Sequence, residues 1–548
     1  MTKTRNRWIG LVFIAMSISL VIIDGTIVNT IFPNVIRALN LSSTEVQWVQ
    51  ESYVLVFASL LLVFGSLADR FGRKRILVIG IAIFVISSVW AGISQDASSM
   101  IAARVLQGVG GSMVLPTTLS LVNANFQGKE RGIAFAVWGA TIGGMVAIGP
   151  VLGGWLAGID FKGFDLGSFH VPEGGWRLAF DINLPLGLIV IAGLLYWVSE
   201  SKQAQRAGGI DFVGAVISTI MFLTLVFGLI EGRIYGWWEQ TSTQFQIGDF
   251  KWATDGISII PVSLGISVVT FVIFYLWERA REKAHKNVLL DLNLFKIASF
   301  RNGSIAALII SMGEFGLLFA IPLWLQNVLG LSPIDSGLVL LFLAGGAFLA
   351  SGAAGALSGK VAAATVVRIG VLLELVAVGT VALFANAEVG WISIAPSLFI
   401  YGIGVGMATA QLTGVIMVDV PPAMSGQGSG TQSTARQVGS ALGIAVLGTM
   451  LFTGTQGSID ARLAELKVPS EQATQISKVV VDSAGSAIPF LKDQLVAQHV
   501  PAATADKIVT AAGDGFTEGT KFSAWAAAGF LGLGFLSTFR LGSRKRKE

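Results

Sequence analysis

Four ionisable side chains lie well inside long apolar stretches of the chain: Asp24, Arg104, Glu314 and Glu374. A charged side chain in hydrocarbon costs about 2.5–3.5 kcal/mol on insertion scales, so residues of this kind usually serve a function. A carboxyl group in such a place can exchange a proton or attract a cation, and its charge responds to hydration and to a nearby arginine. These residues are therefore the candidates for the chemistry of the protein.

The depth of each group follows from the rise of a helix. At about 1.5 Å per residue, Asp24 lies about 25 Å beyond Arg7 and therefore past the middle of the membrane. Arg104 lies near the start of its own apolar stretch, on the same outer side of the membrane. We expect Asp24 and Arg104 to share a polar pocket, either as a functional pair or as a static ion pair. Glu374 lies only about 9 Å beyond Arg368, which places it within reach of cytosolic water and favours a structural role.

Glu314 has several aromatic neighbours in the sequence. Phe315, Phe319 and Trp324 follow it on the same apolar stretch, and Trp138 is a further aromatic candidate on another. An acid among aromatic rings suits a lipophilic cation, through charge attraction and cation–π contact. The alternative is that the acid is satisfied by a neighbouring helix and that the rings pack in the core or face lipid.

The composition shows where these residues must reside. The chain has 548 residues, of which 53% are hydrophobic and 13% charged, about half of the roughly 25% charge of a soluble domain. A protein with several membrane spans is the class that fits. The chain has no cysteine, which excludes disulfides and thiolate metal sites, and its three histidines lie outside the long apolar stretches, so no metal site is expected. The net charge of +4 is too small to indicate nucleic acid.

Fourteen stretches are long and apolar enough to be read as spanning helices of about 20 residues. Most Lys and Arg residues fall at alternate ends of these stretches, with clusters at 70–75, 279–301 and 540–547. This distribution predicts that both termini are cytosolic. The predicted spans are 8–33, 46–68, 76–94, 99–122, 132–157, 178–199, 210–231, 256–277, 302–325, 334–357, 365–385, 391–418, 427–455 and 522–540.

An internal repeat organises the spans. Gly65–Arg70 and Gly355–Lys360 have similar sequences at an offset of 290 residues, and the same offset leads from Asp24 to Glu314. Two duplicated halves around a central path are typical of transporters. The predicted division is an N-terminal six-helix bundle (1–200), two inserted helices with a cytosolic link (201–290), five helices of a C-terminal bundle (291–455), an extracytoplasmic insertion of small folded or hairpin-like form (456–521), and a last helix with a basic tail (522–548).

Two glycine-containing segments also have informative spacing. The loop after the second span combines turn glycines with charges: Gly65, Asp69, Arg70, Gly72 and Arg73. Asp69 can cap a helix or pair with arginine. The fifth span contains Gly149, Pro150, Gly153 and Gly154. Proline kinks a helix and glycine permits close packing, so this span is either a bent structural helix or a pivot between conformations.

Together these motifs resemble the major facilitator superfamily, and specifically its fourteen-spanner drug:proton antiporters. The resemblance implies alternating access by two rocking bundles, with Asp24 as the main proton-titrating group assisted by Arg104. It also implies a cytosolic latch of Asp69, Arg70 and Arg73 with Glu130 or Arg131. One departure is Met145, which stands where the span-five motif usually has glycine. The matching segments are Asp24–Pro33, Gly65–Arg75, Arg104–Gly110, Gly149–Gly154, Trp176–Gly187 and Ser429–Gly439.

We therefore expect an all-α membrane protein with the major facilitator fold, consisting of two six-helix bundles and two inserted helices. The leading hypothesis is a monomeric, proton-coupled exporter of lipophilic cationic compounds in the plasma or bacterial inner membrane. The alternative within transport is an exporter of a neutral or anionic metabolite, a lipid or a self-made antibiotic. A receptor or scaffold would not need intramembrane acids. No nucleotide-binding loop or catalytic triad pattern supports an enzyme, so a proton gradient, without a cofactor, is the expected energy source.

Overall fold

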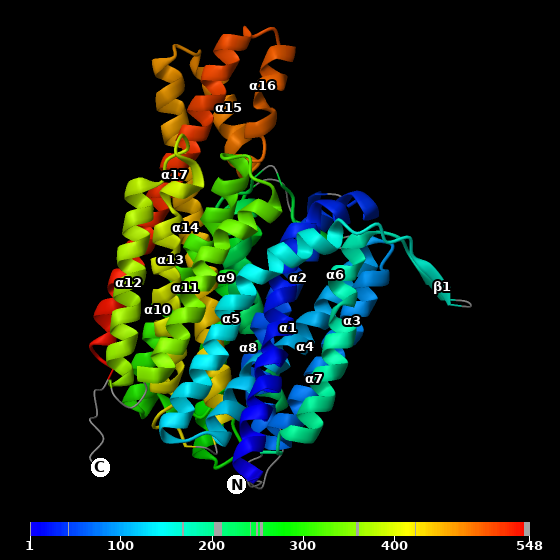
Figure 1. The fold of residues 1–548 in the computed structure, drawn as a ribbon, viewed down its shortest axis with the longest axis vertical. Helices are drawn as coiled ribbons and strands as arrows, with labels where there is room; N and C mark the ends of the chain where they lie inside the picture. The colour runs from blue at the N-terminus through cyan, green and yellow to red at the C-terminus, as the bar shows by residue number, and fades with distance from the viewer. Residues whose placement is uncertain are drawn as a thin grey trace.

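The computed structural model describes residues 2–41, 43–166, 169–201, 211–241, 243–247, 250–252, 256–357, 361–421 and 424–541. Most of these residues belong to helices that run roughly along one direction (Figure 1). A helix satisfies all of its backbone hydrogen bonds internally, which is a requirement for any segment in lipid. The all-helical membrane fold expected from the composition is therefore confirmed.

The first half of the bundle is built from long apolar helices that begin near the N-terminus. A short antiparallel hairpin, which the sequence did not predict, separates the fifth helix from α7. The elements are α1 (Thr2–Leu39), α2 (Ser43–Phe71), α3 (Arg73–Ile93), α4 (Ala97–Asn125), α5 (Gly128–Ala157), β1 (Phe164–Leu166), β2 (Phe169–Val171), η1 (Gly175–Arg177), α6 (Leu178–Asp181) and α7 (Asn183–Trp197).

Two helices follow that pack against each other and against both halves. Between them lies a second small hairpin, and a short 3₁₀ segment leads on to the second half. Helix α8 contacts α2 of the first half, α14 of the second half, and α9. The elements are α8 (Phe212–Tyr235), β3 (Gln246–Ile247), β4 (Phe250–Lys251), α9 (Ile259–Lys283) and η2 (Leu292–Lys296).

The second half repeats the packing of the first. Helices α1, α2, α3, α4, α5 and α7 correspond in order to α10, α11, α12, α13, α14 and α17, because the same partners meet in both halves. The elements are α10 (Ala298–Asn327), α11 (Pro333–Leu357), α12 (Ala363–Phe384), η3 (Gly390–Ser393), α13 (Ala395–Ile416), α14 (Ser425–Glu465), α15 (Ser470–Asp482), α16 (Ile488–Ala497) and α17 (Ala502–Thr538). Asp24 and Glu314 thus stand on equivalent helices. The loop Gly355–Lys360 that suggested the repeat includes residues outside the described part of the chain.

The segment between the last two long helices is folded and helical. Helices α14 and α17 extend well beyond the predicted ends of their spans, and α15 and α16 complete a projection at the end of the molecule opposite the termini (Figure 1). Within the predicted insertion, α14 continues to Glu465 and α15 and α16 follow, so the expected small folded segment is a helical one. Buried leucine, isoleucine and phenylalanine side chains join this projection to the core of the second half.

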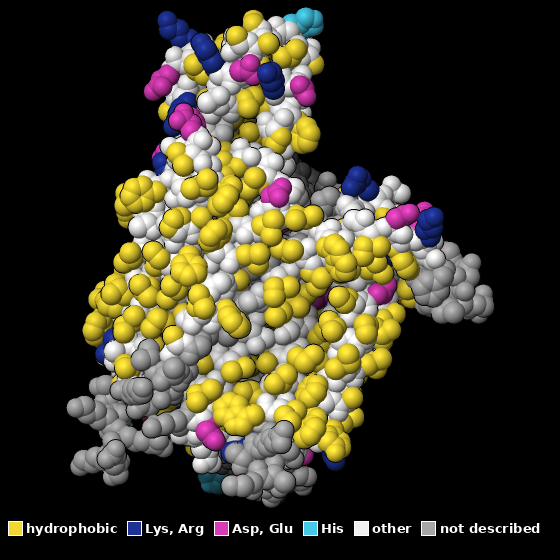
Figure 2. Space-filling view, in the orientation of Figure 1, with side chains coloured by type: hydrophobic (Ala, Val, Ile, Leu, Met, Phe, Trp, Pro, Cys, Tyr) yellow, Lys and Arg dark blue, Asp and Glu magenta, His cyan; other side chains and the backbone are white. Residues whose placement is uncertain are grey.

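The surface of the bundle is that of a membrane protein. Hydrophobic side chains cover the middle of the face in Figure 2, whereas Lys, Arg, Asp and Glu gather over the α15–α16 projection. Eleven helices among the described residues are long and apolar enough to cross a membrane, and the segment Ile334–Ala350 of α11 is a shorter apolar helix. The chain is therefore a multi-pass membrane protein.

Candidate functional site

A buried polar network surrounds Asp24, whose side chain is fully inaccessible on α1. Arg104 Nη1 on α4 donates to Asp24 Oδ2 at 2.7 Å, and Gln107 Nε2, one turn further on α4, donates to Oδ1 at 2.7 Å. Asn183 Nδ2 on α7 reaches Oδ1 at 3.5 Å, and Ser88 on α3 accepts from both amides. Four helices thus meet at one carboxylate, and the structure brings Asp24 and Arg104 together as a direct ion pair.

Arg104 is as enclosed as its partner. Its guanidinium lies 4.4 Å from the ring centroid of Tyr53 on α2 and also donates to Gln107 Oε1 at 2.6 Å. The Nε atom is buried and has no hydrogen-bond partner among the described residues. A buried charge pair is stable only while its geometry is good, and removing one partner leaves the other uncompensated. A proton that neutralises Asp24 would therefore weaken the hold on Arg104.

Sequence reasoning missed three members of this network: Gln107, Asn183 and Ser88. Gln107 and Asn183 do lie within segments that carried the family resemblance, Arg104–Gly110 and Trp176–Gly187, but no role was assigned to them. Helical spacing alone could have identified Gln107, because it follows Arg104 by three residues and so lies on the same face of the helix. Asn183 comes from α7, and only the fold places it beside Asp24.

A second group of ionisable residues lies in the other half. Glu314 on α10 is 3.6 Å from Arg436 on α14, measured between Oε2 and Nη2, and Tyr401 on α13 donates to the Glu314 backbone carbonyl at 3.2 Å. Glu314 is buried and Arg436 is partly exposed. The contacts described for Asp24 and Glu314 lie in their own halves.

Glu374 belongs to this second group, and the expectation that it reaches cytosolic water is wrong. Its side chain on α12 is fully buried, and neither carboxyl oxygen has a hydrogen-bond partner among the described residues. Glu314 and Arg436 are the charged groups that act on it. The error arose because height along a helix does not show which side faces a neighbour, and here α12 turns Glu374 towards α13, where Gly404 lies against its side chain.

The aromatic candidates divide into core and partly exposed residues. Trp324 is completely buried and donates to Thr517 Oγ1 on α17 at 2.9 Å, so it packs between helices and is not a substrate contact. Trp138 is also buried, and its Nε1 donates to Thr118 on α4 at 3.2 Å. Phe315 and Phe319 retain partial exposure on α10 and remain candidates.

The predicted latch joins the two halves at the end that carries the termini. Asp69 at the end of α2 is held by Arg73, with Nη2 2.7 Å from Oδ1. Its oxygens also accept from the backbone N–H groups of Gly426 at 2.8 Å and Gln427 at 3.0 Å, in the first turn of α14. Those N–H groups have no partner within their own helix, and the helix dipole favours a negative charge there. Asp69 therefore caps a helix of the opposite half.

The prediction that Glu130 or Arg131 is the partner of the latch is wrong, because Asp69 bonds to Arg73, Gly426 and Gln427 instead. Glu130 pairs with Arg7 of α1 at 3.4 Å, a contact within the first half. Arg131 donates to Asn123 Oδ1 at 3.2 Å, and Asn123 in turn donates to Ser425 Oγ on α14 at 2.8 Å. Arg131 thus supports the same closure indirectly. The sequence could not reveal the groups that donate to Asp69, because backbone N–H groups leave no signature in residue type.

Glycine makes the close approach of α2 and α14 possible. A Cβ atom on Gly65 would lie 2.6 Å from the carbonyl oxygen of Gly426 and 2.8 Å from Cα of Gly430. The other loop residues have local roles. Arg70 lies over the Phe71 ring with 5.8 Å to its centroid, and Gly72 adopts φ 111° before the first residue of α3.

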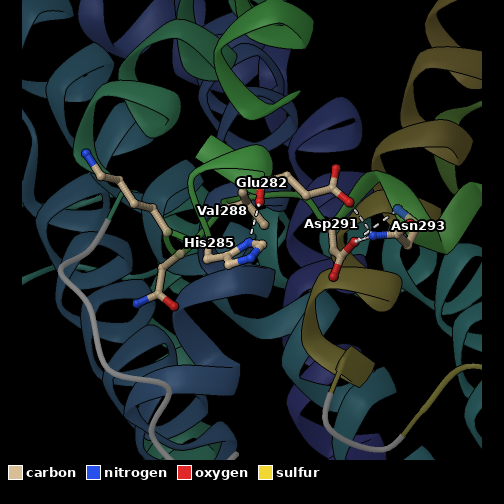
Figure 3. Close-up of a pocket in the computed structure, with 7 residues that line it drawn as sticks. Glu282, His285, Val288, Asp291 and Asn293 are labelled. Carbon is tan, nitrogen blue, oxygen red and sulfur yellow. Dashed lines mark hydrogen bonds between the residues drawn. The ribbon is translucent and has the colours of Figure 1, made fainter. Parts of the chain in front are cut away.

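A polar cavity of about 470 Å³ lies next to the latch, on the link after α9 (Figure 3). Asn293 donates to the carboxylates of Glu282 and Asp291 there. The backbone N–H of Asp291 donates to Gln427 Oε1 at 3.1 Å, so the link also holds the first turn of α14. The lining residues are Glu282, His285, Lys286, Asn287, Val288, Asp291 and Asn293. This cavity lies off the helices that carry Asp24 and Glu314.

The span-five motif forms the seam between α5 and its neighbours. A Cβ atom on Gly149 would lie 1.9 Å from Thr26 Oγ1 on α1, and one on Gly153 would lie 2.8 Å from Ile27 Cγ1. A Cβ atom on Gly154 would clash with the side chain of Ile334 on α11, in the other half. The motif, with Pro150 next to Gly149, thus keeps α5 close to α1 two residues beyond Asp24 and close to the second half as well.

This packing predicts that Gly149→Ala destabilises the protein by about 1–3 kcal/mol, because an added methyl group in a filled core forces strain. Its thermal midpoint in detergent should fall, and Thr26→Ala should restore part of the loss by removing the nearest atom. Gly144→Ala on the same helix is the control, since nothing lies within 4 Å of a Cβ there. Equal effects of Gly144→Ala and Gly149→Ala would contradict the seam.

Comparison with known proteins agrees with this architecture. Residues 14–444 match the Major Facilitator Superfamily. The chain is 29% identical to the "Probable actinorhodin transporter" of Streptomyces coelicolor, over 99% of this chain and 93% of that protein. It is 30% identical to the "Multidrug efflux pump LfrA" of Mycolicibacterium smegmatis, over 96% of this chain and 95% of the pump.

Solved structures of low sequence identity share the fold. The human organic anion transporter MFSD10 (TETRAN) superposes with a TM-score of 0.58 at 11% identity, over 97% of this chain and 99% of that one. The proton:xylose symporter XylE superposes with a TM-score of 0.55 at 13% identity, over 89% and 96%. With its duplicated halves and its matched family profile, the chain belongs to the major facilitator superfamily and is a membrane transporter, not an enzyme.

Proposed function

We propose that the protein is a proton-coupled antiporter that exports lipophilic cationic compounds across the cell membrane as a monomer. Similar proteins include some that are named for multidrug resistance, multidrug efflux or puromycin resistance. This similarity supports export of a small molecule. We also propose that all fourteen long helical segments cross the membrane, with both termini cytosolic. The basic clusters at the terminal end favour that orientation.

The observation that carries proton coupling is the Asp24–Arg104 pair. Both side chains are buried, at 0% and 2% exposure, on helices of the first half. A proton on Asp24 removes the charge that holds Arg104, so protonation and rearrangement of α1 against α4 are linked. In this proposal a proton from outside binds Asp24 and breaks its ion pair with Arg104. When that proton is released to the cytosol, the ion pair forms again.

The observation that favours a cationic substrate is the charge balance of the second group. Glu314 and Glu374 are two acids, and among the described residues Arg436 is the one base that acts on both. When all three are ionised, one negative charge is left over. An unpaired carboxylate in a dry site is unfavourable, so we propose that Glu374 holds a proton in the empty transporter and that a bound cation takes its place.

The latch gives this cycle a closed state at the cytosolic end. Asp69 binds the first turn of α14 only while α2 and α14 are in contact, so the bonds at Gly426 and Gln427 must break before that end opens. Charge-assisted hydrogen bonds contribute about 1.5–3 kcal/mol each. The latch is therefore strong enough to bias the two-state equilibrium without locking it.

Asp24→Asn should abolish export driven by a pH gradient, because the asparagine cannot exchange a proton. The protein should still insert in the membrane and bind substrate. Dye efflux from vesicles with an imposed pH gradient, normalised to folded protein, provides the measurement. Asp335→Asn, which removes an exposed acid in the first turn of α11, in the other half, is the control. Full export by Asp24→Asn would exclude this residue from the coupling mechanism.

Asp69→Asn should slow turnover on the order of tenfold, since losing about 1.4 kcal/mol of latch stability changes the equilibrium by that factor. Substrate affinity, measured by fluorescence quenching, should change little because Asp69 is far from both acid groups. Glu130→Gln is a matched control: its pair with Arg7 is solvent-exposed and such pairs contribute about 0–1 kcal/mol. A large affinity loss with normal turnover would argue against a latch.

Glu314→Gln should impair efflux of a divalent lipophilic cation strongly, of a monovalent cation less, and of a neutral compound hardly at all. Arg436→Gln should increase efflux of the divalent cation, because it leaves both acids without their base. The efflux rates are compared at equal amounts of folded protein. An equal loss for all three substrates in Glu314→Gln would mean that Glu314 is a structural acid satisfied by Arg436.

A further inference from the structure

Two glutamate side chains face each other between α2 and α8, apart from both acid groups described above. The carboxyl groups of Glu51 and Glu231 are hydrogen-bonded to each other. The Oε2 atom of each is buried and has no hydrogen-bond partner among the described residues, and Glu231 is only 1% exposed. An ionised carboxylate has no hydrogen to donate. The bond therefore exists only when at least one of the two carboxyls holds a proton.

The surroundings of the pair are apolar and mostly aromatic. Tyr235, Phe227 and Phe245 pack around one another with ring centroids 5.4–6.3 Å apart, and Trp48 stacks on Phe227 at 6.4 Å. The same cluster includes Ile260 and Leu264 from α9 and Ala441 and Leu442 from α14. Rings and alkyl groups from α2, α8, α9 and α14 thus make up most of the surroundings of the pair, and Glu51 keeps partial exposure.

The charges that act on the pair are few. Tyr235 interacts electrostatically with both glutamates. Among the described residues, the only groups that bring a charge to Glu51 and Glu231 are the two glutamates themselves. Asp24 is paired with a guanidinium and Glu314 lies beside one, whereas the described part of this site shows no base beside its carboxyls. A proton is the cation that two hydrogen-bonded carboxyl groups can share directly.

The pair also joins parts of the molecule that move separately in a rocking mechanism. Glu51 stands on α2, about 27 Å along the helix from Asp69 at 1.5 Å per residue, and so near the end opposite the latch. Glu231 lies close to the end of α8, just before the β3–β4 hairpin. Helix α8 contacts α14 as well as α2. A change at the pair therefore acts on the contact between the first half and the inserted helices.

We propose that Glu51 and Glu231 form a proton-binding clamp, in which one shared proton holds α2 against α8 and its loss to the extracytoplasmic water releases α2. The step is balanced: the bonded acid and carboxylate give two carboxylates and one hydrated proton. Two like charges in a dry site repel each other. The direction of release rests on the proposed orientation, but the shared proton does not.

The chain contains no cysteine, so paired spin labels can be introduced without background. Labels at Asn40, between α1 and α2, and at Trp238, after α8, report the separation of the two elements; both residues are exposed. The distance distribution is measured on the full protein in nanodiscs over a pH series, without substrate or gradient. Infrared difference spectra over the same series record the C=O band of protonated carboxyl groups.

We expect the labelled wild-type protein to shift to longer distances as the pH rises, while the protonated carboxyl band falls. Glu51→Gln/Glu231→Gln should lose that part of the band and keep the short distance at every pH, because the two amides stay bonded without a proton. Tyr235→Phe is the matched control and should keep both responses. A pH-independent distance in the wild type, or an unchanged band in the double variant, would overturn the clamp.

The outcome is separable from that of the proposed transport function. If vesicles show no export driven by a pH gradient but the spectra titrate with the pair, the clamp stands and proton-coupled export falls. If export is normal and the double variant titrates like the wild type, the clamp falls alone. Loss of both responses in Tyr235→Phe would assign the proton to the tyrosine and would also overturn the proposal.

Discussion

A charge inside the membrane must find its counter-charge within the protein, and the arrangement of the first half follows from this constraint. Asp24 and Arg104 are 2.7 Å apart on α1 and α4. Asn183 of α7 also donates to Asp24, and Ser88 of α3 accepts from Gln107 and Asn183. Four helices are thereby oriented around one carboxylate. The same constraint allows the site to switch, because a proton on Asp24 removes the negative charge that attracts Arg104. Stability and coupling thus share one interaction.

The two halves satisfy the constraint to different degrees. In the first half every oxygen of Asp24 is hydrogen-bonded, whereas in the second half Glu374 is fully buried with both oxygens unpartnered among the described residues. Arg436 is 3.6 Å from Glu314 and partly exposed. A fully hydrogen-bonded network such as that of Asp24 suits an exchange in which a proton replaces the guanidinium of Arg104 as the partner of the carboxylate. An incomplete network, with an acid to spare, suits a cation that arrives from outside the protein.

Much of this was predictable from the sequence, and the failures have physical reasons. Depth along a helix sufficed to pair Asp24 with Arg104, because both had to avoid lipid on the same side. It failed for Glu374, and sequence proximity to Glu314 failed to show that Trp324 is buried, since burial depends on the neighbours that a helix face meets. The groups that donate to Asp69 across the interface are two backbone N–H groups, 357 and 358 residues away in the chain. No residue type encodes such a contact, and only the folded duplicate halves create it.

Helix α2 connects these separate sites mechanically. At one end Asp69 caps α14, one turn before it Gly65 allows the two backbones to touch, and near the other end Glu51 bonds to α8. A rigid helix that is bound at both ends cannot tilt until one bond is released. In a transporter with two six-helix bundles alone, the second attachment would have no partner. The two inserted helices therefore need not line the substrate path to matter, since α8 provides the fixed point against which α2 is held.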